Sequence, residues 1–464
     1  MARRRRLAWA GCVACLATAA MPAAAMDLVE AWRAAQRNDL DYAASRAARD
    51  AGATRHRQAD ALWRPTVVLS GAAGVAGNDT SVRGAQFSAP GFGTSADVGF
   101  DTSVNRGVLG RWGLSANLPL YSRERDAQGR QLRLSADVSE FAWVEAQQAL
   151  MLDTARRYFD LVLANESLRV LRQQQGAVGK ALVEARDRFH LGNVPVTDTY
   201  EAAARAEAIA AQVLALETDL QLKQAVFADS TGLTASNEPL LAAADEAMPA
   251  DGKGLAIWLS EADADNPQLR MQSKAVEVAE QEAAKSRGTL APSIDLVAQA
   301  GRERVSGSGE FGSASNSAGN RMIGLQLSLP LYTGGMREAR ELEALHGIDK
   351  ARAQADRARQ QVAQQTRAAW LGLTVGARRV TALAQALMAT RSRLDSTRLG
   401  RQIGDRTTLE LLNAENDAAS AELALLQARI EWLMNRLRLA ALAGHLDEAS
   451  LQSVNASLRR PSSP

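Results

Sequence analysis

Apolar and polar residues alternate with a period of two in four short stretches of the chain. In one of them, Leu114, Ala116 and Leu118 alternate with Ser115 and Asn117. Residues two apart lie on the same face of a β-strand, so each stretch predicts a strand with one apolar and one small or polar face. We expect these strands at 66–76, 111–121, 293–301 and 321–331.

The pattern repeats along the chain. Leu-Pro-Leu-Tyr closes the second predicted strand at 118–121 and returns at 329–332 in the fourth. Each copy is followed by a long proline-free segment rich in Ala, Leu, Gln, Arg and Glu, a composition typical of antiparallel coiled coils. Residues 77–109 and 302–320, between the strands of each pair, are rich in Gly and Ser, so we expect long surface loops there.

Two very long helices are predicted at 124–190 and 338–399. The first would be about 100 Å long at the rise of an α-helix. Gly192 and Gly404 follow these helices, and glycine is favoured where a helix ends in the left-handed conformation. Further helices are expected at 27–63, from Thr197 to about residue 230 and from Thr407 to about residue 443.

The repeat predicts how the chain is organised. The first repeat covers 26–230 and the second covers 259–445, and each contains a helix, two strands and a long helical hairpin. A linker at 231–258 joins them. Residues 446–464 form a C-terminal tail, which we expect to be disordered from Arg459.

The first 25 residues have the features of a signal peptide. Arg3–Arg6 form a basic start, an apolar stretch follows, and Ala23–Ala25 supply a cleavage site. We therefore expect export, from a Gram-negative cell. Both cysteines, Cys12 and Cys15, lie in this segment, so the exported chain has no disulfide or thiol chemistry. Cys12 lacks the leucine that precedes acylated cysteines by three residues, so we expect no lipid anchor.

Composition excludes several classes of function. The chain carries 54 basic and 52 acidic residues, and removal of Arg3–Arg6 leaves a net charge of −2, which does not indicate nucleic-acid binding. No later stretch offers 18 or more uncharged apolar residues, so we expect no membrane-spanning helix. The four histidines have no neighbours at metal-ligand spacing, and there is no catalytic triad or nucleotide loop. We expect no metal, no cofactor and no enzyme activity.

The strands nevertheless have the length of membrane strands. Four strands cannot close a barrel, and lipid excludes open sheet edges, so several chains must share one barrel. A trimer with twelve strands is the natural arrangement. Trp112 and Tyr121, near opposite ends of the second strand, and Tyr332 fit aromatic girdles at the two membrane interfaces. The alternative is a soluble sheet, which the lack of large apolar residues on the second face disfavours.

Two further motifs carry a family resemblance. Residues 188–198, Arg-Phe-His-Leu-Gly-Asn-Val-Pro-Val-Thr-Asp, resemble the first hairpin tip of TolC-like outer membrane efflux proteins. Residues 399–415, Leu-Gly-Arg-Gln-Ile-Gly-Asp-Arg-Thr-Thr-Leu-Glu-Leu-Leu-Asn-Ala-Glu, resemble the second tip. The Leu-Pro-Leu-Tyr copies, the second followed by Thr333-Gly334-Gly335, resemble the strand-to-helix junctions. The resemblance covers nearly the whole exported chain.

The resemblance implies a homotrimeric barrel in the outer membrane and a helical tunnel in the periplasm. Such channels receive cargo from an inner-membrane RND or ABC transporter through a periplasmic adaptor, in small-molecule efflux or type I protein secretion. The sequence names neither the cargo nor the pump. The hairpin tips would contact the adaptor or pump, and their turn residues are Gly192, Asn193, Val194, Gly404 and Asp405.

The resemblance also implies a gate at the tunnel's periplasmic end. By position, Asp198 and Arg406 would take part in contacts that hold it closed, and Glu410 and Asn413 would form the narrowest ring. Asn413 stands where the family often has Asp, so the ring would carry half the usual charge. Arg401 stands where some members have a gating Tyr, so the closed-state contacts would differ.

The same residues have local explanations. Thr407 and Glu410 have the spacing of a capping box, and Asp198 lies in a first helical turn, where an acid is favourable. Two other functions also stay open: a periplasmic adaptor and a non-transporting structural coiled coil. An adaptor would need a compact β-rich domain beside one hairpin, and the strands argue against a purely structural role.

Overall fold

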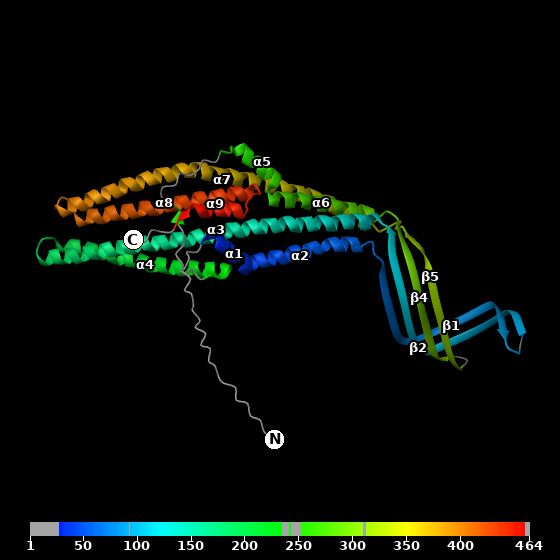
Figure 1. The fold of residues 1–464 in the computed structure, drawn as a ribbon. Helices are drawn as coiled ribbons and strands as arrows, with labels where there is room; N and C mark the ends of the chain where they lie inside the picture. Colours follow the sequence, from blue (N-terminus) through cyan, green and yellow to red (C-terminus); the bar gives the residue numbers. More distant parts are fainter. Residues whose placement is uncertain (1–26, 92, 234–240, 243–251, 310–311, 460–464) are drawn as a thin grey trace, which may run out of the picture. The chain divides into compact units, whose positions relative to one another are not determined.

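The computed structural model describes residues 27–91, 93–233, 241–242, 252–309 and 312–459 (Figure 1). The predicted signal peptide and the last five residues lie outside this range. The chain forms two compact units. The strand unit comprises residues 44–147 and 259–365, and the hairpin unit lies within residues 1–43, 148–258 and 366–464. Each unit takes segments from both halves of the sequence. The units therefore do not correspond to the two predicted repeats, and the boundaries of the repeats stay a prediction.

The strand unit contains a four-stranded antiparallel sheet in the order β1-β2-β4-β5. Its strands are β1 (Thr66–Ala89), β2 (Gly93–Tyr121), β4 (Ser293–Gly309) and β5 (Gly312–Ser328). β1 and β5 lie at the two edges, and no strand within the described part of the chain pairs with their outer sides. The sheet is therefore open in the single chain.

The strands are longer than the hydrophobic pattern predicts. β1 and β2 stay paired through most of 77–109, and β4 and β5 through most of 302–320, so the expectation of two long loops is wrong. Backbone ladder bonds hold these Gly- and Ser-rich parts, and such bonds do not require apolar side chains. β5 ends at Ser328, which leaves the second Leu-Pro-Leu-Tyr copy beyond the strand.

The register lines up the predicted apolar residues across the sheet. Leu69 lies opposite Leu114, and Leu296 lies opposite both Leu118 and Leu325. Directly paired residues share a face of a sheet, so these leucines lie on one face, which we call the apolar band. The other face, here the polar face, carries Ser70, Ser115, Asn117, Gln326 and Ser328 among others.

The outer part of the β1–β2 hairpin crosses the polar face of β4 and β5. A Cβ atom on Gly309 would lie 1.6 Å from the carbonyl oxygen of Ser103, so only glycine permits this approach. Asn316 Nδ2 donates a hydrogen bond to Thr80 Oγ1 at 3.4 Å. By the register, Gly309 and Asn316 both lie on the polar face. The hairpin therefore bends over this face instead of continuing the plane of the sheet.

Small residues allow close helix packing in the strand unit. A Cβ atom on Gly52 would lie 2.4 Å from Ser139 Cβ, and one on Gly288 would lie 2.8 Å from the Glu124 backbone nitrogen. The strand unit contains most of α2 (Leu40–Ala61) and α5 (Leu255–Asp265), all of α6 (Pro267–Gly288) and the first parts of α3 (Arg123–His190) and α7 (Met336–Gln402).

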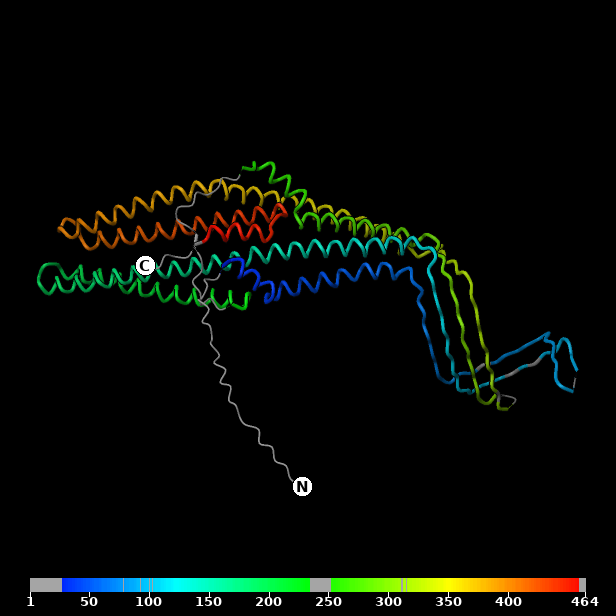
Figure 2. Tube along the Cα trace, viewed as in Figure 1, coloured from blue at the N-terminus to red at the C-terminus, as the bar shows by residue number. Residues whose placement is uncertain are grey.

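The hairpin unit consists mainly of two helical hairpins (Figure 2). One joins the second part of α3 to α4 (Val196–Thr231), and the other joins the second part of α7 to α8 (Thr408–Leu442). Leu394 of α7 packs against Ala414 and Ala418 of α8, and such pairing of large with small side chains fills the seam between helices. The predicted long helices and both restarts are confirmed within three residues.

One prediction near the start of the chain is wrong. The helix expected at 27–63 breaks at Asp39 into α1 (Leu28–Asn38) and α2, because the Asp39 carboxylate accepts a hydrogen bond from Tyr42 N at 2.9 Å and starts α2. The C-terminal tail, expected to be disordered only from Arg459, forms α9 (Glu448–Ala456) before that residue, and β6 (Leu458–Arg459) pairs with β3 (Leu241–Ala242). Residues 460–464 lie outside the described residues. Leu451 and Val454 of α9 are fully buried, which explains its order.

None of the described helices combines the length and the apolar character needed to cross a membrane.

Candidate functional site at the hairpin tips

The first hairpin tip turns at Gly192. Its φ of 73° is the left-handed conformation that glycine adopts without strain. The Asn193 N–H donates to the Arg188 carbonyl at 2.8 Å, and the Gly192 N–H donates to the Phe189 carbonyl at 2.9 Å, so the last carbonyls of α3 are satisfied. Asn193 is exposed and Val194 is half-buried.

The second tip is built the same way. Gly404 has a φ of 82°, and the Asp405 N–H donates to the Gly400 carbonyl at 2.9 Å. Thr407 then caps α8. The two turns predicted from Gly192 and Gly404 are therefore confirmed, and Gly192, Asn193, Gly404 and Asp405 are exposed.

Glu410 forms the capping box that its spacing predicts. Its Oε2 accepts hydrogen bonds from Thr407 N at 2.8 Å and Thr407 Oγ1 at 3.1 Å, and Glu410 N donates to Thr407 Oγ1 at 3.1 Å. Its Oε1 accepts from Arg406 Nη1 at 3.1 Å. The Thr407 backbone N–H and the Arg406 guanidinium both favour the carboxylate, so the pKa of Glu410 lies below its ordinary value.

Arg406 lies along its own chain instead of reaching α4. Besides its contact with Glu410, its stem packs over Gly400, where an added Cβ atom would lie 2.7 Å from Arg406 Cγ. Among the described residues, none forms an ion pair with Asp198, which is exposed near the start of α4. Within one chain, the expected pairing of Asp198 with Arg406 is not formed.

Arg401 connects the two hairpins. Its Nη2 donates to Glu184 Oε2, which joins the end of α7 to α3. Glu184 also lies 3.4 Å from Arg188, one turn further along α3. The Arg401 side chain is only 23% exposed, so this ion pair is better shielded from water than the Arg406 contact. The sequence indicated Arg401 as a site residue but not its partner Glu184, because no local sequence pattern relates two residues so far apart in the chain.

Asn413 also connects the hairpins. Arg205 Nη1 of α4 donates to Asn413 Oδ1 of α8 at 3.0 Å. Nearby, Leu412 packs against Val178 and Ala181 of α3, which supplies the apolar part of the same contact. The predicted ring residue Asn413 is therefore engaged within the chain, while the partner Arg205 was not predicted.

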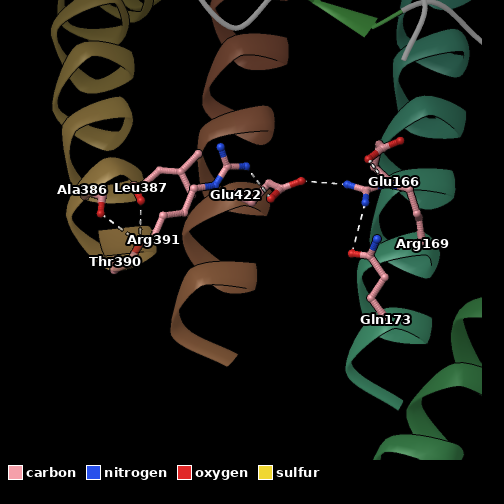
Figure 3. A network of polar contacts seen from close by, with 8 residues as sticks. All are labelled: Glu166, Arg169, Gln173, Ala386, Leu387, Thr390, Arg391 and Glu422. Carbon is pink, nitrogen blue, oxygen red and sulfur yellow. Dashed lines mark hydrogen bonds and ion pairs between the residues drawn. The ribbon is translucent and has the colours of Figure 1, made fainter. Parts of the chain in front are cut away.

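Further along the hairpins, Glu422 of α8 joins α7 to α3 (Figure 3). It accepts from Arg391 Nη2 at 2.9 Å and from Arg169 Nη2 at 2.7 Å. Arg169 also donates to Glu166 and Gln173 on its own helix. Burial lowers the pKa of Arg169, but hydrogen bonds to Glu166 and Glu422 outweigh it and raise the pKa above the ordinary value. Arg401, Asn413 and Glu422 thus form a polar seam between the hairpins.

The three girdle candidates lie at different places in the sheet. Trp112 is 51% exposed and lies in the interior of β2, because the strand is longer than predicted. Tyr121 ends β2 and accepts a hydrogen bond from Arg123 Nε at 3.2 Å. Tyr332 is 89% exposed and lies between β5 and α7. Trp112 and Tyr121 therefore mark the two ends of the apolar band, and Tyr332 lies outside the strands.

The described residues contain no group of three or more His, Cys, Asp or Glu side chains placed to hold a metal ion.

Comparison with known families decides the identity of the chain. The model of the family described as "Outer membrane efflux protein" matches residues 32–233 and 258–445, which together span most of the sequence. The chain belongs to the outer membrane efflux protein family. The predicted resemblance is confirmed, and so is its implication of an outer-membrane channel for efflux or secretion with a helical part in the periplasm. The family consists of channel proteins, not enzymes.

Two relatives illustrate this membership. The chain is 27% identical to outer membrane protein TolC of Escherichia coli over 346 residues, which cover 70% of this chain and 68% of the relative. It is 26% identical to the alkaline protease secretion protein AprF of Pseudomonas aeruginosa over 437 residues, which cover 93% and 87%.

Solved structures of outer-membrane channels share the fold. The structure of VceC from Vibrio cholerae superposes with a TM-score of 0.69 at 18% identity and covers 90% of this chain and 96% of that one. The MtrE channel of Neisseria gonorrhoeae superposes with a TM-score of 0.68 at 18% identity and covers 91% and 90%. These likenesses confirm the predicted class, a helical tunnel combined with an antiparallel β part.

Proposed function

We propose that three copies of this efflux protein form one channel through the outer membrane, with a twelve-stranded barrel. The observation that carries this proposal is the open four-stranded sheet. Hydrocarbon cannot satisfy the free backbone groups of edge strands such as β1 and β5, so each edge must pair with another copy. The smallest single-chain barrels have about eight strands, which one chain cannot supply.

The two faces of the sheet fit the two environments of such a barrel. The apolar band is exposed in the single chain, with Leu325 at 70% and Leu69 at 73%. Burial of these leucines in hydrocarbon removes the cost of their contact with water. The polar face would line an aqueous channel. Trp112 and Tyr121 would lie at the two interfaces of the membrane.

The channel would receive cargo from a periplasmic adaptor and an inner-membrane RND or ABC transporter. The exposed tip residues Asn193 and Asp405 are the parts of the hairpins best placed to contact such partners. Photocrosslinking side chains at these two positions should capture an adaptor in cells. The same side chain at Glu217, which pairs with Arg172 and lies roughly 30 Å along α4 from its start, is the control and should capture none. Equal capture at all three positions would contradict docking at the tips.

We propose that the hairpin tips gate the channel. Arg401 with Glu184 holds the two hairpins of one chain together, and Asp198 would pair with Arg406 of a neighbouring chain. Glu410 would stand at the narrowest ring with Asn413. Three Glu410 carboxylates facing one pore would favour cations, because the walls of a narrow pore strengthen their common field.

Conductance in planar bilayers tests the gate. Asp198→Ala and Arg406→Ala should each raise single-channel conductance, because each removes the proposed ion pair between neighbouring chains. Glu410→Gln should reduce cation selectivity and weaken block by multivalent cations. If Glu410→Gln leaves selectivity unchanged, the residue only caps α8 and has no role in the pore.

The cargo of the channel is either protein or small molecules. Alignment with AprF covers 93% of this chain, and that relative is named for secretion of alkaline protease. This favours type I protein secretion as a candidate beside small-molecule efflux. Deletion of the gene separates the two: loss of secreted proteins with unchanged drug susceptibility supports secretion, and the opposite result supports efflux.

A further inference from the structure

The apolar face of the sheet carries three arginines in the rows around Trp112. In the register, Trp112 lies opposite Arg302, and Gly110 lies opposite Arg304. Directly paired residues share a face, so both arginines lie on the same face as the apolar band. Arg321 on the edge strand β5 lies on this face as well, in the row of Leu114 and Ala300. All three arginines are exposed, and we call them the basic patch.

Small residues leave a hollow beside two of these arginines. Gly71, Ala73 and Gly110 form its floor, and Trp112, Arg302 and Arg304 form part of its wall. Two serines on β5 hold the guanidinium groups at the wall: Arg302 Nε donates to Ser317 Oγ at 3.1 Å, and Arg304 Nε donates to Ser315 Oγ at 3.4 Å. Among the described residues these bonds use only the Nε of each guanidinium and leave its two terminal nitrogens for another acceptor.

The positive charge of the basic patch is not neutralised within the described part of the chain. No Asp or Glu there forms an ion pair with Arg302, Arg304 or Arg321. By contrast, Arg111, on the polar face at the same level, lies 3.9 Å from Glu303. The patch therefore presents three charges on the face that carries the apolar band, and an anionic ligand would compensate them.

The depth of the patch narrows the choice of ligand. Tryptophan favours the boundary between hydrocarbon and headgroups, which places Trp112 at the edge of the membrane. A strand rises about 3.4 Å per residue, so the row of Arg304 lies roughly 7 Å beyond Trp112. This is the level of lipid headgroups.

We propose that the basic patch binds phosphate groups of lipids in the outer leaflet of the outer membrane. The inference rests on the proposed function, because it takes the apolar band as the lipid-facing side. Arginine forks bind phosphate oxygens in pairs, and the hydroxyl group of Ser317 is a further donor. A lipid fits better than free phosphate, because one molecule can place its chains on the apolar band and its phosphate on the patch.

Native mass spectrometry of the full-length protein in detergent tests this site. The probes are lipid A with both phosphates and lipid A without them. Arg302→Gln/Arg304→Gln should bind phosphorylated lipid A about tenfold to thirtyfold more weakly than the unaltered protein, since each arginine near an anionic lipid surface contributes a factor of about five. Arg352→Gln/Arg359→Gln, which removes two charges from α7, is the matched control and should bind as the unaltered protein does.

Three results would overturn the proposal. The first is equal affinity of the patch variant and the control for phosphorylated lipid A. The second is equal binding of the two lipid probes by the unaltered protein. The third is full displacement of the lipid by inorganic phosphate at the same concentration, which would assign the patch to free phosphate. The same spectra report the number of chains, so an intact trimer without phosphate preference refutes the lipid site alone.

Discussion

Glu410 shows how one side chain can serve its own helix and an assembled pore. Its carboxylate closes the capping box with Thr407 and accepts a hydrogen bond from Arg406. These contacts occupy both carboxylate oxygens but leave the negative charge exposed at the tip. A capping role and a pore role are therefore compatible, and they respond differently to substitution.

The capping role predicts a pH dependence. The pKa of Glu410 lies below the ordinary 4.5 because the Thr407 N–H and Arg406 stabilise the carboxylate. Its contribution to folding is thus complete above the unfolded pKa and is lost as pH falls below 4.5 through the folded pKa. Hydrogen exchange of the first turns of α8, corrected for intrinsic rates, should show this loss of protection. In Glu410→Gln, whose amide cannot titrate, the same pH change should have a smaller effect; an equal effect would contradict the prediction.

Arg401 allows a second prediction at the residue scale. Arg401→Ala should weaken the contact between α7 and α3 by about 1 kcal/mol or less, because the Glu184 pair is partly exposed. It should also raise channel conductance. The matched control is Arg398→Ala, since Arg398 lies 3.5 Å from Glu415 and joins α7 only to its own hairpin partner α8. Equal conductance changes in the two variants would show that contact between the hairpins does not hold the gate.

At the scale of elements, local chemistry explains what the sequence could predict. Glycine at 192 and 404 and the Thr407 cap determine turns from neighbouring residues alone, and the structure confirms them. Alternation revealed the parts of the strands that form the apolar band. Alternation could not reveal that most of 77–109 and 302–320 also forms strands, because backbone pairing holds their Gly and Ser residues.

One helix cap and the contacts between residues far apart in the sequence were not predicted. The break at Asp39 is a local effect, because one cap interrupts a pattern that otherwise favours a continuous helix. The partners of Arg401 and Asn413, which are Glu184 and Arg205, come from other helices and have no sequence signal. Covariation across homologues is the kind of signal that could have found them.

The strand faces give a prediction at the element scale. Leu325→Arg should destabilise the folded channel in lipid by about 2–4 kcal/mol, because it places a charge in the middle of the apolar band. Gln326→Arg, one residue away on the polar face, should cost far less. Urea titration of the channel in lipid vesicles measures both. Equal destabilisation, or a larger cost at Gln326, would mean that the assignment of the two faces is wrong.

At the scale of the whole molecule, the open sheet is the feature that one chain cannot explain. β1 and β5 expose backbone groups, and the apolar band exposes large side chains. Each feature alone is compatible with a soluble protein that has a partner. Together they support the proposal of lipid on one face and further strands at both edges, which is the geometry of a barrel shared among identical chains.

The mass of the protein extracted from outer membranes in mild detergent tests this central claim most directly. Light scattering with correction for bound detergent, or native mass spectrometry, counts the chains without any assumption about cargo or gate. We expect one species of three chains, which supplies twelve strands to a closed barrel. A monodisperse monomer that is stable in detergent would contradict it, because four strands with two open edges cannot form the channel alone.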